Sequence, residues 1–223
     1  MKITQRTFQI LKNFSSINQT LCVNKGNKIR TVSTNKTIMA EATVQEEFPR
    51  EFALYDLSEF LGVVSLFDNP DFDFDTYYVQ ITDDAKASSN YFYAEKSMVT
   101  VPPEKMVQLP DEPIQFTLGD KVLKHVLQAA GVMKLPEIVV QGDGDIIRLV
   151  TTNTKNTTGH EFAYDVGKTD KRFKMVFNVD NLKLISGTYD VTISSKKMSK
   201  FTLSDGSMTY FIANEGSSYF GGE

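Results

Sequence analysis

The feature that most constrains this chain is a residue pattern that occurs twice, once in each half. Residues 9–16 and 121–128 each carry apolar side chains at helical spacing around a Lys, with polar residues on the opposite side. Residues 55–60 and 177–182 each place an aromatic residue before an Asx residue that can cap a short helix. Strand-like runs surround both pairs in the same order. The repeat predicts a duplicated α+β domain, and two unrelated domains built from common α+β elements are the alternative.

Each half is expected to contain one long amphipathic helix and one short capped helix. The first long helix starts near Arg6, and its apolar face is made by Ile10, Leu11, Phe14 and Ile17. The short helix follows Asp56 and is so apolar that it must lie on a sheet; its apolar residues are Leu57, Phe60, Leu61, Val64 and Phe67. The second long helix is expected to end at Gly131 and buries Val122, Leu123, Val126, Leu127 and Ala130. Its short companion is expected in residues 181–186.

A proline-rich segment separates the two halves. Residues 96–113 contain Pro102, Pro103, Pro110 and Pro113, which disfavour both a regular helix and a central strand. Several apolar side chains accompany these prolines, so we expect an extended connector that packs along a surface. The sequence thus predicts an N-terminal domain over residues 1–95 and a C-terminal domain over residues 114–223.

Length, charge and cysteine content limit the function classes. A chain of 223 residues with 41% apolar residues suits two domains of about 110 residues each. The net charge of −4 argues against a generic nucleic-acid binder, although a local basic strip is compatible with it. Cys22 is the single cysteine, which fits a reducing compartment. The first residues lack a signal-peptide pattern and no run is long enough to span a membrane, so we expect a cytosolic protein with no membrane partner.

Two stretches resemble a known family. LKNFSSIN at 11–18 and ALYDLSEFLGVVSL at 53–66 are similar to the corresponding stretches of the sliding clamps of T-even-type bacteriophages, which are DNA polymerase processivity factors. The resemblance implies a DNA-clamp fold with two similar domains per chain. In such clamps, antiparallel sheets lie outside and two helices per domain line a central hole. It also implies a homotrimeric ring around duplex DNA that does no chemistry and needs no cofactor.

The resemblance also implies a set of partners. The ring would bind double-stranded DNA without sequence specificity, tether the replicative DNA polymerase and be loaded by an ATP-dependent clamp loader. In T-even phages the same ring activates late transcription, which adds a late sigma factor and a coactivator. The expected location is the cytoplasm of the infected bacterial host.

A DNA-lined hole calls for long basic side chains on helix faces, without groups that read bases. Lys12, Lys121 and Lys124 lie on the polar faces of the two long predicted helices. By the resemblance, the DNA-facing residues are Lys12, Lys121, Lys124 and Lys183. Their neighbours Asn13 and His125, with Lys2 and Arg6 at the start of the first helix, complete the predicted set. A plain solvated helix face is the alternative for these residues. The short helix departs from related clamps because it presents Glu59 and Gly62 where others carry Lys. We therefore expect the N-terminal domain to hold DNA less strongly.

The connector and two strands are the expected contact surfaces. In sliding clamps, partners insert hydrophobic tails into a groove beside the connector, which here would be formed by Val101, Met106, Val107, Leu109 and Pro110. Subunits join by pairing of edge strands, and the expected interface residues are Tyr91, Phe92, Tyr93, Phe162 and Tyr164. The alternative is that these side chains pack within one subunit.

Enzymatic and metal-binding functions have little support in the sequence. Only His125 and His160 are present, without metal-ligand spacing, and Cys22 lies in an apolar run typical of a core residue. Asp71, Asp73 and Asp75 have the first spacings of a calcium loop, but Thr76 and Thr82 replace its Gly and Glu. Alternation with Phe72 and Phe74 favours a strand with its carboxylates outward. The remaining alternative function is a β-rich structural or assembly protein of a phage virion.

Overall fold

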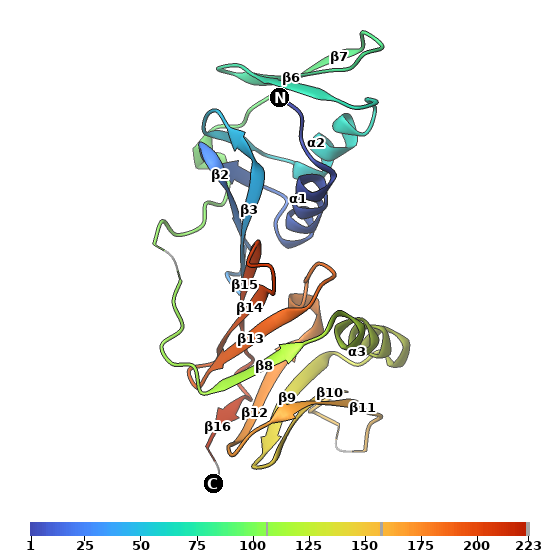
Figure 1. Cartoon of the computed structure of the whole chain (residues 1–223), viewed down its shortest axis with the longest axis vertical. Helices are drawn as coiled ribbons and strands as arrows, with labels where there is room; N and C mark the ends of the chain where they lie inside the picture. The colour runs from blue at the N-terminus through green and yellow to red at the C-terminus, as the bar shows by residue number, and fades with distance from the viewer. Residues whose placement is uncertain (106, 157, 222–223) are drawn as a thin grey trace. The chain divides into compact units, whose positions relative to one another are not determined.

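The computed structural model describes residues 1–105, 107–156 and 158–221. The chain forms two compact units, residues 1–105 and 106–223 (Figure 1). Both units combine antiparallel strands with helices, and the described residues include three α-helices and two 3-10 turns. The chain is therefore an α+β protein, as the repeated pattern predicts.

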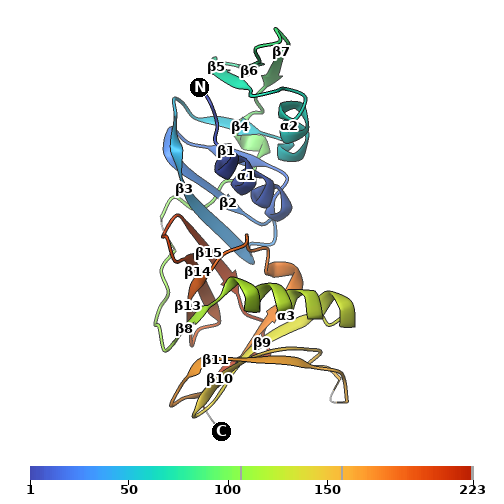
Figure 2. The ribbon, with the colours of Figure 1, turned by 45° about the vertical axis from the view of Figure 1, so that its right-hand side comes forward.

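Unit 1 contains two helices beside a set of short sheets. Its elements are α1 (Gln5–Ile17), β1 (Leu21–Val23), β2 (Gly26–Val32), β3 (Ile38–Phe48), β4 (Phe52–Leu54), α2 (Leu57–Val64), β5 (Asp71–Phe74), β6 (Tyr78–Thr82), β7 (Ser88–Phe92) and the 3-10 turn η1 (Lys96–Met98). β1 pairs with β4, β2 with β3, and β5–β6–β7 form a three-stranded sheet, all antiparallel. Figure 2 shows α2 beside α1, with the three-stranded sheet next to α2.

The helices of unit 1 follow from their caps and apolar spacing. Thr4 caps α1, since its side chain accepts a hydrogen bond from the backbone of Thr7. Asp56 caps α2 in the same way, through the backbone of Glu59. α1 buries Ile10, Leu11, Phe14 and Ile17, while α2 buries Leu57, Phe60 and Val64. The apolar faces predicted for both helices are thereby confirmed at these positions, although α2 ends at Val64 and not at Phe67.

Unit 2 contains two sheets and one long helix, which packs on the sheet that includes β9, β10 and β11. Its elements are β8 (Ile114–Leu118), α3 (Asp120–Met133), β9 (Glu137–Asp143), β10 (Ile146–Thr152), β11 (Phe162–Lys168), β12 (Arg172–Asn178), the 3-10 turn η2 (Val179–Asn181), β13 (Tyr189–Ser194), β14 (Met198–Leu203), β15 (Met208–Ala213) and β16 (Tyr219–Phe220). One sheet has the order β11–β10–β9–β12–β16, and in the other β8, β13, β14 and β15 pair in that order. Phe201 of β14 packs against Phe177 of β12, which belongs to the other sheet, and against Tyr189 of β13.

Three details differ from the expectations. α3 continues past Gly131 to Met133. Its C-cap is Lys134, which adopts a left-handed backbone conformation with a φ of 53° and donates its N–H to two backbone carbonyls of the last turn. The second helix of unit 2 is a single 3-10 turn, not an α-helix: Asn178 caps it as predicted, but only three residues are helical. β16 was not expected from the sequence, and it pairs with β12 through Phe173 and Lys174.

The acidic run is a strand, in agreement with the alternation of its side chains. β5 pairs with β6 and buries Phe72, whereas Asp73 is exposed on the other face. In the described part of the chain, no three His, Cys, Asp or Glu side chains are grouped so that they could hold a metal ion. Nor does any helix in that part have the length and apolar character needed to cross a membrane.

Candidate nucleic-acid interface

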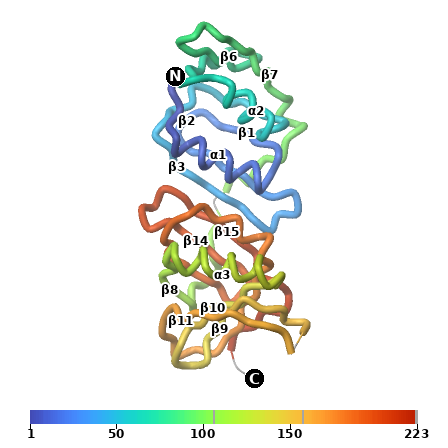
Figure 3. Tube along the Cα trace, turned by 90° about the vertical axis from the view of Figure 1, so that its right-hand side faces the viewer, coloured from blue at the N-terminus to red at the C-terminus, as the bar shows by residue number. Residues whose placement is uncertain are grey.

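The exposed face of α1 is polar and basic. Arg6 and Lys12 are both exposed, on the side opposite the buried Ile10 and Phe14 (Figure 3 looks onto α1). Within the described residues, neither Arg6 nor Lys12 forms an ion pair. Their charges are therefore available to an anion in solution.

A buried carboxylate fixes the start of α1. Glu46 on β3 accepts from the backbone N–H of Thr4 at 2.5 Å and from the Thr7 hydroxyl at 2.6 Å. Burial raises the pKa of Glu46, and the hydrogen bonds from Thr7 and Thr4 outweigh that effect and lower it. Glu46 thus stays ionised at neutral pH and anchors the basic helix to β3.

A groove runs between α1 and α2. It has a volume of about 770 Å³, and Lys12 is its only cationic lining residue among those described. Small residues of α2, Ser58, Gly62 and Ser65, form part of its wall. Glu59 is exposed on the same helix. The α2 side of unit 1 therefore adds no positive charge, as the sequence predicts.

α3 carries the basic face of unit 2. Lys121 and Lys124 are exposed, whereas Leu123, Val126 and Ala130 are buried against the sheet. The Lys124 ammonium lies 2.5 Å from a carboxylate oxygen of Asp120, one turn earlier on the same helix. No ion pair involves Lys121 in the part of the chain that the structure describes. The two lysines of α3 thus differ in how strongly they are neutralised.

The side chain of His125, on α3, reaches the neighbouring strand β11. Its Nδ1 is 2.8 Å from the hydroxyl of Tyr164 on β11, and the two rings are 6.0 Å apart. The side chain is half-buried. Since one ring nitrogen is occupied by Tyr164, only the other is available to a phosphate.

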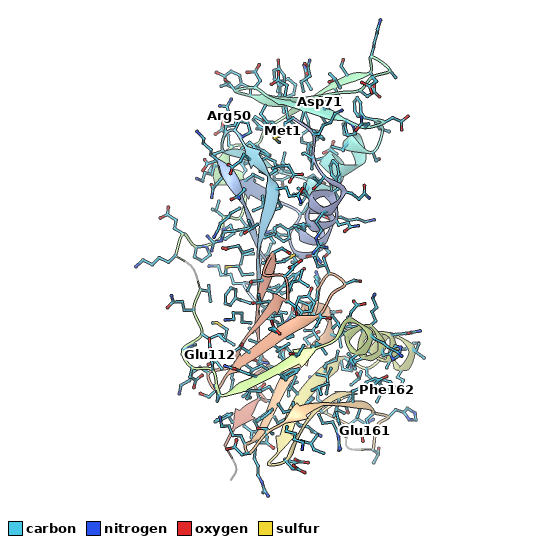
Figure 4. All side chains as sticks on the ribbon, viewed as in Figure 1. Met1, Arg50, Asp71, Glu112, Glu161 and Phe162 are labelled. Carbon is cyan, nitrogen blue, oxygen red and sulfur yellow. The ribbon has the colours of Figure 1, made fainter. Side chains whose placement is uncertain are left out.

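The remaining predicted DNA-facing residues are held by local contacts. The Lys2 ammonium donates to the backbone carbonyl of Asn69 at 2.6 Å and lies 3.8 Å from Asp71. Figure 4 shows Met1 beside Asp71, and the amino group of Met1 is 2.5 Å from that carboxylate. Asn13 and Lys183 are half-buried, and each has an interaction partner. Lys2, Asn13 and Lys183 are thus less available than Lys12 and Lys121.

The strand edges differ in what their aromatic residues do. β7 lies at the end of its sheet, and Phe92 on it is 68% exposed. Tyr91 faces α2 instead: its ring packs edge-on against Phe60, and its hydroxyl donates to the carbonyl of Asp56 at 3.1 Å. Burial and the nearby Glu59 and Asp56 raise the pKa of Tyr91 to about 12. Tyr93 follows β7 and stacks on Phe52.

β11 likewise ends its sheet in unit 2. Phe162 and Tyr164 lie on the same side of β11, with ring centroids 5.5 Å apart, and Figure 4 shows Phe162 near α3. Within the described residues, β7 pairs with β6 and β11 with β10, so each strand has one edge without a backbone partner. Such edges are available for pairing with another chain.

The connector is fixed at both ends. Val99 is buried with Cys22 and Ala53, and the burial of Cys22 raises the pKa of its thiol. At the other end, the Asp111 carboxylate accepts from the hydroxyls of Ser194 and Ser195 and from the backbone N–H of Ser195, at 2.5 to 2.9 Å.

The predicted groove residues lie between these anchors. Val101 is 40% exposed, Val107 and Leu109 are half-buried, and Pro110 is exposed. Met106 lies outside the described residues.

Three anchoring acids were missed by sequence reasoning: Glu46, Asp111 and Asp120. The sequence assigns Asp111 only to the connector, because its hydrogen-bond partners are more than eighty residues away and no local pattern relates them to Asp111. Asp120 carries a usable signal, since an acid four residues before a Lys on a helix predicts an ion pair.

Comparison with known proteins gives consistent results. A family model described as DNA polymerase processivity factor matches residues 2–101. The sliding clamp of Vibrio phage KVP40 is 34% identical over 222 residues, covering 96% of this chain and 99% of the relative. The sliding clamp of Escherichia phage RB69 is 29% identical over 228 residues, covering 98% of each. That of Enterobacteria phage T4 is 26% identical and covers 88% of each.

Solved structures share the fold at low sequence identity. A. fulgidus PCNA, bound to the C-terminal region of FEN-1, has a TM-score of 0.71 at 12% identity, over 93% of this chain and 94% of that one. The Helicobacter pylori beta clamp, bound to a DNA ligase peptide, has a TM-score of 0.72 at 10% identity, over 96% of this chain and 64% of that one. The α+β architecture is therefore that of the DNA-clamp fold.

Proposed function

This chain belongs to the sliding-clamp family of DNA polymerase processivity factors, and on that premise we propose that three copies close into a ring around duplex DNA. A sliding clamp acts in phage DNA replication without doing chemistry itself. The likeness to three phage clamps, over 88% or more of this chain in each case, speaks against the alternative of a virion assembly protein.

The observation that carries the ring is the pair of sheet-end strands, β7 in unit 1 and β11 in unit 2. Head-to-tail pairing of β7 with β11 of the next copy satisfies the open backbone edges of both strands, and a closed ring repeats this pairing at every seam. Phe92, exposed on β7, would then be covered by the neighbouring copy, while Phe162 and Tyr164 on β11 lie on the other side of the seam. Tyr91 and Tyr93 support this edge from within the subunit through Phe60 and Phe52.

The DNA-facing surface is the exposed side of α1 and α3. Arg6, Lys12 and Lys121 would contact phosphates as interchangeable point charges, which permits sliding. Lys124 and His125 would contribute less, because Asp120 and Tyr164 already engage them. Lys2, Asn13 and Lys183 would act mainly at the margins of this face.

Partners would bind along the connector. Val101 offers exposed apolar surface, and Val107, Leu109 and Pro110 follow it in the sequence, between the anchors at Val99 and Asp111. A hydrophobic tail of the replicative polymerase or of the ATP-dependent loader fits such a surface. We extend the same proposal to the late sigma factor and coactivator of phage transcription, in the cytoplasm of the infected host.

The ring is tested by mass and by a seam variant. Light scattering of the wild-type protein should give three times the 25.1 kDa subunit mass at micromolar concentration. Phe92→Asp should dissociate the ring, because it places a charge in the seam. Tyr219→Asp is the matched control, since Tyr219 is 53% exposed and lies on β16, at the end of its sheet opposite β11. Equal masses for the two variants would contradict the proposed seam.

The encirclement of DNA is tested by trapping. Rings loaded on nicked circular DNA should remain bound until the circle is cut, and should then slide off the ends. Retention on the linear product would show ordinary binding and would overturn the topological role. Val101→Asp should leave trapping intact and should lower the processivity of the cognate polymerase.

A further inference from the structure

One basic residue of the DNA-facing surface is already engaged by a carboxylate of its own helix. Lys124 donates to Asp120 Oδ2 at 2.5 Å, and Asp120 Oδ1 accepts from the backbone N–H of Gly187 at 2.8 Å. The second contact fixes the carboxylate, because Gly187 precedes β13 and lies outside the helix. The hydrogen bond from Lys124 lowers the pKa of Asp120, so the pair is ionic at neutral pH.

The other two lysines proposed to face DNA lack such a partner. Lys121 is exposed one turn away, and within the described residues it forms no ion pair; the same holds for Lys12 on α1. The three lysines that would meet DNA are therefore not equivalent. Two present a full charge, and the third presents a charge that a carboxylate of the protein competes for.

The Asp120–Lys124 pair is exposed enough for a phosphate to compete with it. The side chains are 35% and 56% exposed, respectively. Exposed pairs of this kind are weak, so a DNA phosphate can displace the carboxylate and the carboxylate can reclaim the lysine. Exchange of this type shortens the lifetime of each phosphate contact without removing the charge from the helix.

We propose that Asp120 competes with DNA phosphates for Lys124 and thereby lowers the friction of the sliding ring. The inference rests on the proposed function, in which α3 faces DNA. It assigns Asp120 a positioning role, since Asp120 acts on DNA only through Lys124.

A purely structural role for Asp120 makes a different prediction. An acid in the first turn of a helix is favourable toward the helix dipole, and the bond to Gly187 ties α3 to the chain before β13. Asp120→Asn keeps an oxygen that can accept from Gly187 but loses the negative charge. The variant therefore separates the competition for Lys124 from the tie to Gly187.

The test tracks fluorescent rings as they diffuse on stretched DNA after loading. Asp120→Asn should reduce the diffusion coefficient by about two- to fivefold at low salt, a size set by the release of weak pairs in three subunits. The difference should shrink as salt rises, since salt weakens the released phosphate contacts. Asp190→Asn is the matched control, because it removes the same charge from an exposed side chain on β13 and should leave diffusion unchanged.

Two double variants locate the effect. In a Lys124→Gln background, Asp120→Asn should no longer slow diffusion, because the lysine that it releases is missing. In a Lys121→Gln background, Asp120→Asn should still slow it. A slowing that persists without Lys124 would overturn the proposal and assign Asp120 a structural role.

The outcomes separate this inference from the proposed function. If wild-type rings slide and leave at DNA ends, but Asp120→Asn rings diffuse equally fast, only the inference is wrong. If wild-type protein is not retained on circular DNA at all, the proposed function is wrong. Should Asp120→Asn lower the melting temperature, Asp120→Ser provides a second variant, whose hydroxyl can also accept from Gly187, and the same diffusion result is required of it.

Discussion

Both units place a long helix, four strands, a short helical segment and further strands in that order, but they differ in the second helix. α2 spans eight residues behind its Asp56 cap, whereas the corresponding stretch behind Asn178 forms a 3-10 turn of three residues. Both caps accept a backbone hydrogen bond near the start of the helix. The caps alone therefore do not determine how far the helix continues.

The difference arises from the side chains that come after each cap. α2 buries Leu57, Phe60 and Val64 along one face, so each turn gains contacts with the core. After Asn178, Asp180 and Asn181 are weak helix formers, and Leu182 is buried beyond the turn. The next residues are then held by side chains, because Ile185 donates to the Tyr210 hydroxyl and Gly187 to Asp120. Apolar periodicity, not capping, sets helix length here.

The largest expected effect comes from removing an aromatic side chain from the buried apolar face of α2, which has no counterpart on the 3-10 turn η2. Phe60→Ala should lower the free energy of unfolding by about 3–5 kcal/mol, because Phe60 is 3% exposed and supports Tyr91. Leu182→Ala, in the equivalent stretch of unit 2, should cost about 2 kcal/mol. Denaturant unfolding measures both, with Leu66→Ala as the exposed control. Equal losses at Phe60 and Leu182 would contradict the stated reason for the difference.

A smaller effect concerns how the long helices are anchored. Glu46→Ala should cost about 1–3 kcal/mol, because the Thr4 N–H and the Thr7 hydroxyl lose their acceptor in a buried site. α3 has no equivalent, since Gly119 caps it without a side-chain hydrogen bond. Glu47→Ala, at an exposed neighbour on β3, should be close to neutral in the same unfolding experiment. A neutral Glu46→Ala would show that the anchor is dispensable.

The two short-helix caps should respond differently to acid. The backbone N–H of Glu59 and the Gln19 amide lower the pKa of Asp56 below its ordinary value. Because the folded pKa is depressed, the contribution of Asp56 is complete above its unfolded pKa of about 4 and is lost as the pH falls through the folded value. Asn178 does not titrate.

Amide hydrogen exchange should reveal this contrast. Exchange at the start of α2, corrected for intrinsic rates, should accelerate below about pH 4, while exchange at η2 should not change. Asp56→Asn should remove the pH dependence at α2. Equal acceleration in both units would point to global unfolding instead of cap titration.

The smallest expected effect comes from adding the missing cap to α3. Gly119 has a φ of −68°, and an added Cβ meets no atom within 4 Å. Gly119→Ser should therefore stabilise α3 by a few tenths of a kcal/mol, about the size by which Thr4→Gly should weaken α1. The melting temperatures of the two variants should shift in opposite directions. A lower melting temperature for Gly119→Ser would show that its hydroxyl does not reach the helix N–H groups.

Features that depend on neighbouring residues were predictable from the sequence. The apolar faces of α1 and α3, the Asp56 cap, and β5 with Phe72 inward all follow from local spacing. The family also followed from two quoted stretches, since LKNFSSIN and ALYDLSEFLGVVSL are long enough to be specific.

Features that depend on distant residues were not predictable. The Asp111 contacts with Ser194 and Ser195 join residues that no local pattern relates, and the same is true of Glu46 with Thr4. The pairing of His125 with Tyr164, which engages one ring nitrogen, also joins residues that are distant in the sequence. Sequence spacing placed His125 on the polar face of its helix, but only the fold shows which strand its ring reaches.

The central claim, that the exposed faces of α1 and α3 line the hole of a ring around DNA, is tested most directly by lysine acetylation of loaded rings. Lys12 and Lys121 should be protected relative to rings without DNA. Lys36 and Lys196, exposed in hairpin turns, should react equally in both states. Protection of Lys36 and Lys196, with Lys12 and Lys121 unchanged, would contradict the assignment of the DNA-facing surface.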